Sequence, residues 1–292
     1  MPAEPGVYRF RDDRDRVIYV GRASDLRVRV RSYAGDLADR PHLRRMVPQV
    51  RRVEAVVCAS VPEAAWLERN LLERALPRWN RIRGGLELVG WLELDADPAR
   101  PLLRLVVAEA DRPASAFGPY LGVERLALAR RGLLRVWPLE LAGQRLDPAA
   151  GSLAEARGVV PADLGRFAER IRAVLARDPA AIDELRHRLA GARDQAVAQL
   201  AFEVAGQVVE ETAAVDWLVA AQRVTGCTEG LVVAGWADGV LVTVRASGDR
   251  LDRWTSRPSS REAGERAASA TPARWRAFAV RNAELAAALR AC

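Results

Sequence analysis

Apolar and polar positions alternate at the start of the chain in the way expected of a β-hairpin. Two short runs of β-branched and aromatic residues, Gly6 to Phe10 and Val17 to Gly21, flank the polar segment 11–15. Ser24 and Asp25 follow at the spacing of a helix N-terminus. The first residues therefore predict two paired strands and then a helix.

A third strand and a longer helix are expected further along. The apolar run Ala55 to Ala59 predicts the strand. The order Ser60-Val61-Pro62-Glu63 matches a capping box with an early proline, and Pro77 cannot continue a helix. These signals predict a helix from about Val61 to Leu76.

That predicted helix has a charged residue, Glu68, in the middle of its apolar face. An ionised carboxylate that faces a core is costly unless it is paired or binds a cation. Two interpretations of Glu68 follow: an ion pair with a nearby arginine, or a metal ligand. The apolar face comprises Ala64, Ala65, Leu67, Leu71, Leu72 and Ala75. The polar residues off this face are Glu63, Arg69, Asn70, Glu73 and Arg74.

The whole chain predicts an α+β protein in four segments. Residues 1–84 form a small antiparallel sheet flanked by helices, and residues 85–150 form a second, smaller α+β segment. Residues 151–224 form a helical hairpin or bundle, and residues 225–292 a β-hairpin followed by a helix. The elements expected after residue 85 are strands at Leu86 to Leu94 and Leu102 to Val107, a turn at Phe117-Gly118-Pro119-Tyr120, a helix from Val123 to Leu134, a hairpin of Leu231 to Ala234 with Val240 to Val244, and a last helix from Arg274 to Arg290.

Composition favours a polyanionic partner such as DNA. All 45 basic residues are arginine, the net charge is +7 and the pI is about 10.2. Counterion release drives the binding of such a chain to nucleic acid, although a positive charge also serves solubility alone. The stretch of Arg44, Arg45, Arg51 and Arg52 is either a DNA-backbone contact or a solvated face.

Few other chemistries are available. The three cysteines, Cys58, Cys227 and Cys292, are far apart, which argues against a disulfide framework or a cysteine zinc site. Two histidines exclude multi-histidine metal sites. Without a long apolar run or a signal-peptide pattern, we expect a cytoplasmic, nucleoid-associated protein with no membrane partner. Trp137, Trp217 and Trp275 are expected in the core, and for Trp254 packing is favoured over base stacking.

Two tripeptides, Gly6-Val7-Tyr8 and Tyr19-Val20-Gly21, precede a set of polar residues in a fixed order. In their order and spacing these positions resemble the GIY-YIG nuclease family, within it the UvrC and Cho type of excinuclease subunit. Weaker similarity continues through Phe117-Gly118-Pro119-Tyr120, Trp137-Pro138-Leu139 and residues 200–205, the last resembling the UVR helical hairpin. The set comprises Arg22, Arg29, Tyr33, Glu68 and Asn80.

This resemblance implies a role for each residue. Glu68 would ligate one Mg²⁺ or Mn²⁺ ion, because a hard cation suits carboxylate and water oxygens. Tyr8 and Tyr19 would position or deprotonate the attacking water, which for a phenol of pKa about 10 requires help from the cation or nearby arginines. Arg29 would clamp the scissile phosphate. The remaining two, Tyr33 and Asn80, would orient phosphate and water or hold the site in shape.

Some positions depart from the family pattern. Arg22 replaces the usual lysine, and since arginine stays protonated it can stabilise charge but cannot be a base, which shifts that role to a tyrosine. Trp79 replaces a tyrosine. Residues 143–161 lack the family's cysteines, so we expect no iron–sulfur cluster. Val209 and Glu210 replace an Arg-Asp pair, which argues against docking on UvrB.

The resemblance predicts a DNA endonuclease that makes a metal-dependent single-strand incision during nucleotide excision repair. We further expect the chain to lack the C-terminal RNase H-like nuclease domain of UvrC, with residues 231–253 as a remnant of the segment leading into it. A non-catalytic DNA-binding adaptor in a repair complex is the alternative. A sequence-specific GIY-YIG endonuclease is less favoured, because the similarity beyond residue 86 is to UvrC. The sequence does not predict an oligomeric state.

Overall fold

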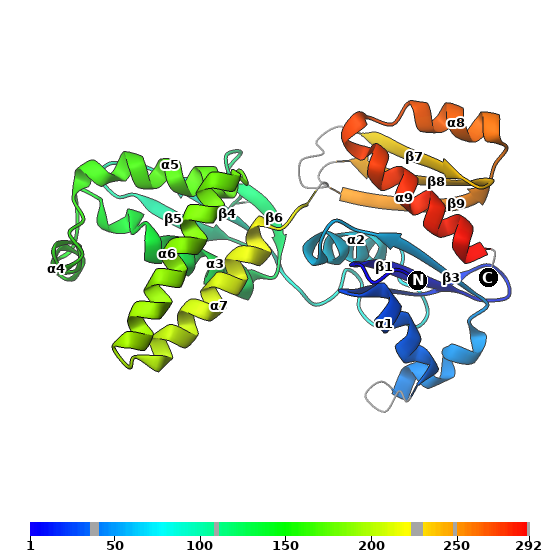
Figure 1. Ribbon diagram of the computed structural model, residues 1–292, viewed down its shortest axis with the longest axis horizontal. Helices are drawn as coiled ribbons and strands as arrows, with labels where there is room; N and C mark the ends of the chain where they lie inside the picture. The colour runs from blue at the N-terminus through cyan, green and yellow to red at the C-terminus, as the bar shows by residue number, and fades with distance from the viewer. Residues whose placement is uncertain (36–40, 108–110, 223–229, 248–249, 291–292) are drawn as a thin grey trace. The chain divides into compact units, whose positions relative to one another are not determined.

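The chain folds into two compact units of mixed α and β structure (Figure 1). The computed structural model describes residues 1–35, 41–107, 111–222, 230–247 and 250–290. One unit joins residues 1–86 to residues 221–292, and the other comprises residues 87–220. The predicted α+β class is confirmed. The segments predicted as 85–150 and 151–224 share the second unit, whereas the predicted tail 225–292 belongs to the unit of the N-terminal sheet.

The N-terminal sheet is antiparallel, in the order β2-β1-β3. Tyr8 lies on the central strand, opposite Gly21 on one side and Ala55 on the other. The third strand begins three residues earlier than predicted, because Glu54 forms an ion pair with Arg9 on β1 and Arg52 forms one with Asp15 after β1, which hold this polar start in the sheet. The elements are β1 (Gly6–Arg11), β2 (Val17–Ala23), α1 (Leu26–Arg31), β3 (Arg52–Val57), α2 (Val61–Arg74) and three short 3-10 helices, Ser32–Ala34, Pro41–Arg45 and Val47–Gln49.

Helix α2 begins as predicted and has more buried surface than predicted. The Ser60 hydroxyl accepts a hydrogen bond from the backbone N–H of Glu63 at 3.1 Å, and the Glu63 carboxylate accepts one from the N–H of Ala59. Placing Glu63 and Asn70 off the buried face was wrong, since they are 1% and 3% exposed. Strand β9 (Arg250–Pro258) packs on this second side of α2.

Glu68 lies on the predicted face, with buried Ala64 one turn before it and buried Leu72 one turn after it, but its own side chain is 21% exposed. Ala75, predicted on the apolar face, is the exposed C-cap residue of the helix.

The C-terminal residues form a second antiparallel sheet in the order β7-β8-β9, whose third strand was not predicted. Only Leu251 and Trp254 of that strand are apolar and buried among arginine, serine and threonine, so its pattern gives little strand signal. The elements are β7 (Leu231–Ala237), β8 (Val240–Ser247), β9, α8 (Arg261–Ser269) and α9 (Ala273–Arg290).

Helix α9 closes the outer edge of β3. The Asn282 side chain accepts a hydrogen bond from the backbone N–H of Val57 at 2.7 Å and donates one to its carbonyl at 3.2 Å. An edge strand otherwise presents unpaired backbone groups. The C-terminal helix therefore completes the N-terminal sheet.

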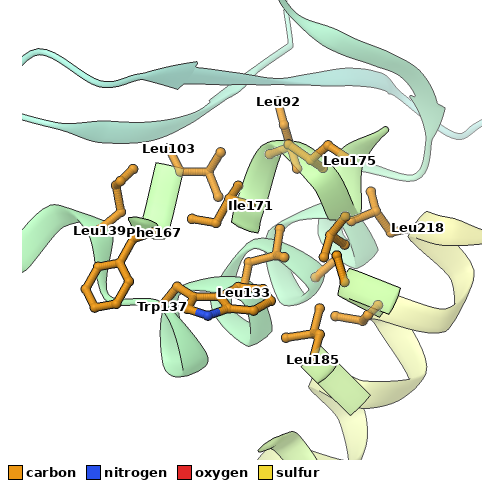
Figure 2. Packing of buried hydrophobic residues seen from close by; sticks show 14 of the residues in the cluster. Leu92, Leu103, Leu133, Trp137, Leu139, Phe167, Ile171, Leu175, Leu185 and Leu218 are labelled. Carbon is orange, nitrogen blue, oxygen red and sulfur yellow. The ribbon is translucent and has the colours of Figure 1, made fainter. Parts of the chain in front are cut away.

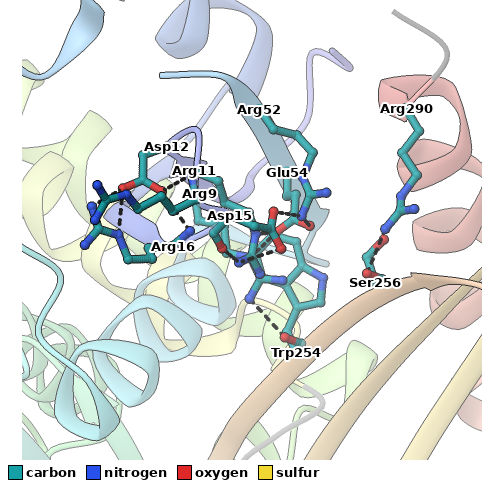
Figure 3. A network of polar contacts seen from close by, with 11 residues as sticks. Arg9, Arg11, Asp12, Asp15, Arg16, Arg52, Glu54, Trp254, Ser256 and Arg290 are labelled. Carbon is teal, nitrogen blue, oxygen red and sulfur yellow. Dashed lines mark hydrogen bonds and ion pairs between the residues drawn. The ribbon is translucent and has the colours of Figure 1, made fainter. Parts of the chain in front are cut away.

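A polar network joins β1, β3 and β9 (Figure 3). Arg9 forms an ion pair with Glu54, lies 4.0 Å above the Trp254 ring and donates to the Trp254 carbonyl at 2.9 Å. Burial would raise the pKa of Glu54, but the guanidinium groups of Arg9 and Arg11 hold that pKa below its ordinary value. Trp254 is 4% exposed, so it packs as favoured from the sequence.

The second unit has its own sheet, in the order β5-β4-β6, covered by helices. Leu92 and Leu103 of the sheet pack with Trp137 and Ile171 (Figure 2). Trp217 is only partly buried, against Tyr120. The elements are β4 (Val89–Asp95), β5 (Leu102–Val106), β6 (Phe117–Leu121), α3 (Val123–Val136), α4 (Pro148–Ala156), α5 (Leu164–Leu175), α6 (Pro179–Ala198) and α7 (Phe202–Val219), with short 3-10 helices at Leu139–Leu141 and Pro161–Asp163.

The predicted turn at 117–120 is wrong, because these residues belong to strand β6. Proline has no N–H to donate and is tolerated on an edge strand, which is the position of β6. Cys227, Cys292 and the predicted boundary at 224 lie outside the described residues. Among the residues described, no helix is long and apolar enough to cross a membrane.

We expect Asn282→Ala to lower the free energy of unfolding of the first unit by about 2–3 kcal/mol, because it leaves buried backbone groups of Val57 without partners. Urea denaturation measures this change, and hydrogen exchange should show faster exchange at Val57. The neighbouring Arg281→Ala removes only an exposed ion pair with Glu4 and should cost below about 1 kcal/mol. Equal urea midpoints for the two variants would contradict the edge-closing role.

Candidate active site

An aromatic cluster lies on one face of the N-terminal sheet. Tyr8 and Phe10 are two residues apart on β1, Tyr19 is on β2, and Tyr33 is in the 3-10 helix after α1. The ring centroids are 5.9 Å apart for Tyr8 and Tyr33, and 6.2 Å apart for Tyr19 and Tyr33. The fold therefore brings together three phenols from separate elements.

The three phenols are linked by hydrogen bonds. The hydroxyl oxygens of Tyr8 and Tyr33 are 2.6 Å apart, and Tyr33 also bonds to Tyr19. The Arg29 side chain bonds to Tyr8 at the other end of this chain. Tyr8 is fully buried, whereas Tyr19 is half-buried. Tyr19 is therefore the phenol with the better access to a bound molecule.

The glycines of both tripeptides are required by close packing. A Cβ atom on Gly21 would lie 2.5 Å from the Tyr8 hydroxyl oxygen, and one on Gly6 would lie 2.3 Å from the Val56 carbonyl oxygen. Gly21 thus leaves the space that the Tyr8 ring occupies. Neither this role of Gly21 nor the contribution of Phe10 was predicted from the sequence, although the two-residue alternation from Tyr8 places Phe10 on the same face.

The phenols are poor bases in this environment. Burial raises the pKa of Tyr8 to about 12, and the nearby Tyr19 adds to the increase. Burial, then the neighbouring phenols, also raise the pKa values of Tyr19 and Tyr33, and the Glu68 charge further raises that of Tyr19. The positive charge of Arg29 lowers all three pKa values, but by less than burial raises them. At neutral pH the phenols are therefore hydrogen-bonding groups in their neutral form.

Glu68 lies near this cluster and is paired. Its Oε2 is 3.5 Å from Nε of Arg22, and both side chains are partly exposed. Arg22 follows Gly21 on β2, so the pair lies at the sheet end that carries the second tripeptide. The negative charge of Glu68 contributes to the raised pKa of Tyr19. The ion pair, one of the two interpretations of Glu68 from the sequence, is present, and the carboxylate is also accessible from solvent.

A metal ion at this position would have one protein carboxylate. No group of three or more His, Cys, Asp and Glu side chains is arranged for a metal ion in the part of the chain that is described. A single carboxylate fits Mg²⁺ or Mn²⁺, which keep several waters and bind substrate phosphate oxygens, but not a zinc or iron–sulfur centre.

Arg29 carries its charge into the cluster. Its Nε is buried and has no hydrogen-bond partner among the residues described. Burial alone would lower the pKa of Arg29, but its neighbours Tyr8 and Tyr33 raise it. A protonated guanidinium with a donor to spare beside neutral phenols is a suitable contact for a phosphate oxygen.

Asn80 contacts the backbone of β2. Its Oδ1 accepts from the N–H of Val20 at 2.9 Å and its Nδ2 donates to the Val20 carbonyl at 2.8 Å, while the N–H of Trp79 bonds to Ile18 at 3.1 Å. Of the two roles expected for Asn80, the contacts support holding the site in shape.

The four arginines expected at a DNA contact differ. Arg44, Arg45 and Arg51 are exposed, on or next to the short 3-10 helices. Arg52 is bound to Glu54 and to Asp15, at 3.1 and 2.6 Å, so much of its charge is neutralised. The first three are the better placed to meet a polyanion.

Comparisons with known proteins agree with this geometry. Residues 4–81 match the UvrC-like GIY-YIG domain. The UvrABC system protein C of Syntrophotalea carbinolica is 29% identical over 86% of this chain and 41% of its own length. That of Natronomonas pharaonis is 36% identical over 48% of this chain and 23% of its own length. The chain thus spans less than half the length of these relatives.

A solved structure is also similar. The GIY-YIG N-terminal endonuclease domain of UvrC from Thermotoga maritima, bound to its catalytic magnesium, is 34% identical over 27% of this chain and 86% of that domain, with a TM-score of 0.25. Residues 4–81 are therefore similar to the UvrC-like GIY-YIG domain, the resemblance found in the sequence.

We expect none of the four tyrosines, which include Tyr120, to titrate at its ordinary pKa of about 10 in the folded protein. Absorbance of phenolate should appear only at higher pH, whereas the urea-unfolded chain should titrate near 10. Because the folded pKa values are raised, stability is full below about pH 10 and decreases as the pH rises through them. A native titration with a midpoint at 10 would contradict the burial of the cluster.

Proposed function

We propose that this UvrC-like GIY-YIG domain is a metal-dependent DNA endonuclease that makes a single-strand incision during nucleotide excision repair. The observation that supports this proposal is a cluster of three phenols, one guanidinium and one carboxylate beside the N-terminal sheet. The residues are Tyr8, Tyr19, Tyr33, Arg29 and Glu68. In a domain of this family, phenols, a free guanidinium donor and a solvent-accessible carboxylate are the groups that a phosphodiester hydrolase requires.

Two charged residues hold the phosphate. Arg29, whose side chain as a whole is only partly buried, holds a phosphate oxygen through its protonated guanidinium and shields the charge that develops there. Glu68 holds one Mg²⁺ or Mn²⁺, which when bound supplies Lewis-acid stabilisation and a more acidic water. Arg22, now paired with Glu68, would be available to contact the phosphate when Glu68 holds the ion.

Tyr19 holds the attacking water. It is half-buried and close to the Glu68 charge, while its own hydroxyl is fixed by Tyr33 and, through Tyr33, by Tyr8. Because its pKa is raised, the neutral phenol orients the water at neutral pH by hydrogen bonding. Proton removal by Tyr19 needs the phenolate, whose population increases about tenfold per pH unit.

The second candidate function is a DNA-binding adaptor without turnover. The observation that favours it is the Glu68–Arg22 ion pair, which occupies the carboxylate that we propose as the metal ligand. An ion pair that persists in Mg²⁺ leaves a folded DNA-binding domain and no catalysis. Tight DNA binding with no cleavage of any substrate would select this function.

UvrB is the partner that the family suggests. Val209 and Glu210, at the departures from the UVR pattern, are exposed on α7 and do not disturb its packing. Adding UvrB to a damaged duplex, and measuring whether incision increases, tests this partner separately from the nuclease.

We expect Glu68→Gln to lower the rate of plasmid nicking in Mg²⁺ or Mn²⁺ by about a thousandfold or more, because it removes the metal ligand. Tyr19→Phe should lower the rate by about a hundredfold or more. Glu73→Gln changes the same charge on the same helix, in a residue paired with Arg69 and Arg250, and should nick at the wild-type rate. Equal nicking by all four proteins would refute the site.

The pH profile separates the two roles of Tyr19. If phenolate is the base, kcat should increase about tenfold per unit between about pH 7 and pH 9 without levelling off, since the pKa of Tyr19 lies above that range. Single-turnover nicking measures this slope, and Tyr19→Phe should flatten it. A slope retained in Tyr19→Phe would restrict Tyr19 to orienting the water.

A further inference from the structure

The C-terminal sheet has one covered face and one face that is largely open. Helix α9 packs on this sheet (Figure 1). Val233, Val244 and Trp254 are buried on the covered face, and a Cβ on Gly235 would lie 2.0 Å from the Ala279 carbonyl oxygen of α9. Side chains alternate between the two faces of a strand. The residues between these positions therefore project from the other face.

The open face has two arginines on neighbouring strands whose like charges destabilise the sheet. Arg245 on β8 and Arg253 on β9 are directly opposite each other in the antiparallel register, and both are exposed. Like charges in opposite cross-strand positions are destabilising. Within the described ranges neither guanidinium has an acidic partner, unlike Arg250 on the same strand, which is paired with Glu73 at 2.7 Å.

Hydroxyl groups and a hollow accompany these arginines. Thr243 and Thr255 are the next opposed pair along the same two strands, and their hydroxyls are bonded to each other. Val232 on β7 is opposite Arg245. Together these five side chains line an open hollow of about 310 Å³. Two guanidinium groups that have no acidic partner among the described residues, and the one O–H that the threonine pair leaves free, surround this hollow as donors suited to phosphate oxygens.

We propose that this hollow, lined by Val232, Thr243, Arg245, Arg253 and Thr255, is a second DNA-binding surface that contacts the phosphate backbone. The choice of DNA as the polyanion rests on the proposed function. DNA phosphates would turn the repulsion between Arg245 and Arg253 into attraction. Trp254 projects from the covered face, so the contact is with the backbone and not with stacked bases. The surface therefore adds affinity without reading sequence.

Fluorescence anisotropy of a short labelled DNA duplex, over a series of salt concentrations, tests this surface. All proteins carry Glu68→Gln, which prevents cleavage during binding. Compared with that parent, Arg245→Gln/Arg253→Gln should weaken binding about tenfold or more and reduce the slope of log K against log salt by between about 1 and 2, close to 0.9 per lost phosphate contact. Arg245→Lys/Arg253→Lys should keep most of that slope.

A matched control has the same charge change on helix α8. Arg261→Gln/Arg266→Gln removes two arginines that are paired with Glu265 and Glu262, and should leave the slope unchanged. The thermal midpoint of Arg245→Gln/Arg253→Gln should equal or exceed that of its parent, because the cross-strand repulsion is gone. An unchanged slope in this double variant, or an equal loss in the α8 control, overturns the proposal.

Nicking separates this proposal from the proposed nuclease function. In the protein that retains Glu68, and so can nick DNA, Arg245→Gln/Arg253→Gln should raise KM for DNA and leave kcat at saturating DNA unchanged. If the slope of log K against log salt depends on these arginines but the protein nicks no DNA, the proposal of a DNA-binding surface stands and the proposed nuclease function is rejected. If the protein nicks DNA normally but Arg245→Gln/Arg253→Gln leaves the salt slope unchanged, the nuclease function stands and the proposed surface is rejected.

Discussion

The hydrogen bond between the hydroxyls of Tyr8 and Tyr33, 2.6 Å between oxygens, joins the central strand to the segment after α1. Buried hydroxyl groups need partners, and here they partner each other, with Arg29 and Tyr19 at the two ends of the chain. Gly21 permits this by leaving room for the Tyr8 ring. The burial that fixes the phenols also raises their pKa values, so the arrangement favours orientation over proton removal at neutral pH.

The sheet that carries these phenols has two outer edges, and an asparagine side chain bonds to the backbone of each. Asn80 bonds to both backbone groups of Val20 on β2, and Asn282 does the same to Val57 on β3. An amide side chain has a donor and an acceptor, as a peptide group does, so it can take the place of a neighbouring strand. One asparagine follows α2 and the other lies near the end of the chain. The C-terminal residues therefore belong to the structure that supports the site.

Much of the fold could be predicted from local pattern. The hairpin, the Ser60 cap and helix α2 depend on residues close in sequence, through two-residue alternation and capping hydrogen bonds. Strand β9 was missed because its outward positions are polar. The burial of Glu63 and Asn70 was missed for a related reason: α2 is covered on a second side by β9, a segment distant in sequence, and a helical pattern does not show which distant segment covers a polar face.

For the site, the sequence by itself determined which residues were candidates, because the tyrosines, Arg29, Glu68 and Asn80 stand in a recognisable order. Only the tertiary structure decided what each one contacts. Asn80 bonds to the backbone of strand β2. Glu68 is partly exposed and paired with Arg22, and all three phenols are desolvated. The physical reason is that desolvation and hydrogen-bond partnership depend on neighbours in space, which the order of residues along the chain does not specify.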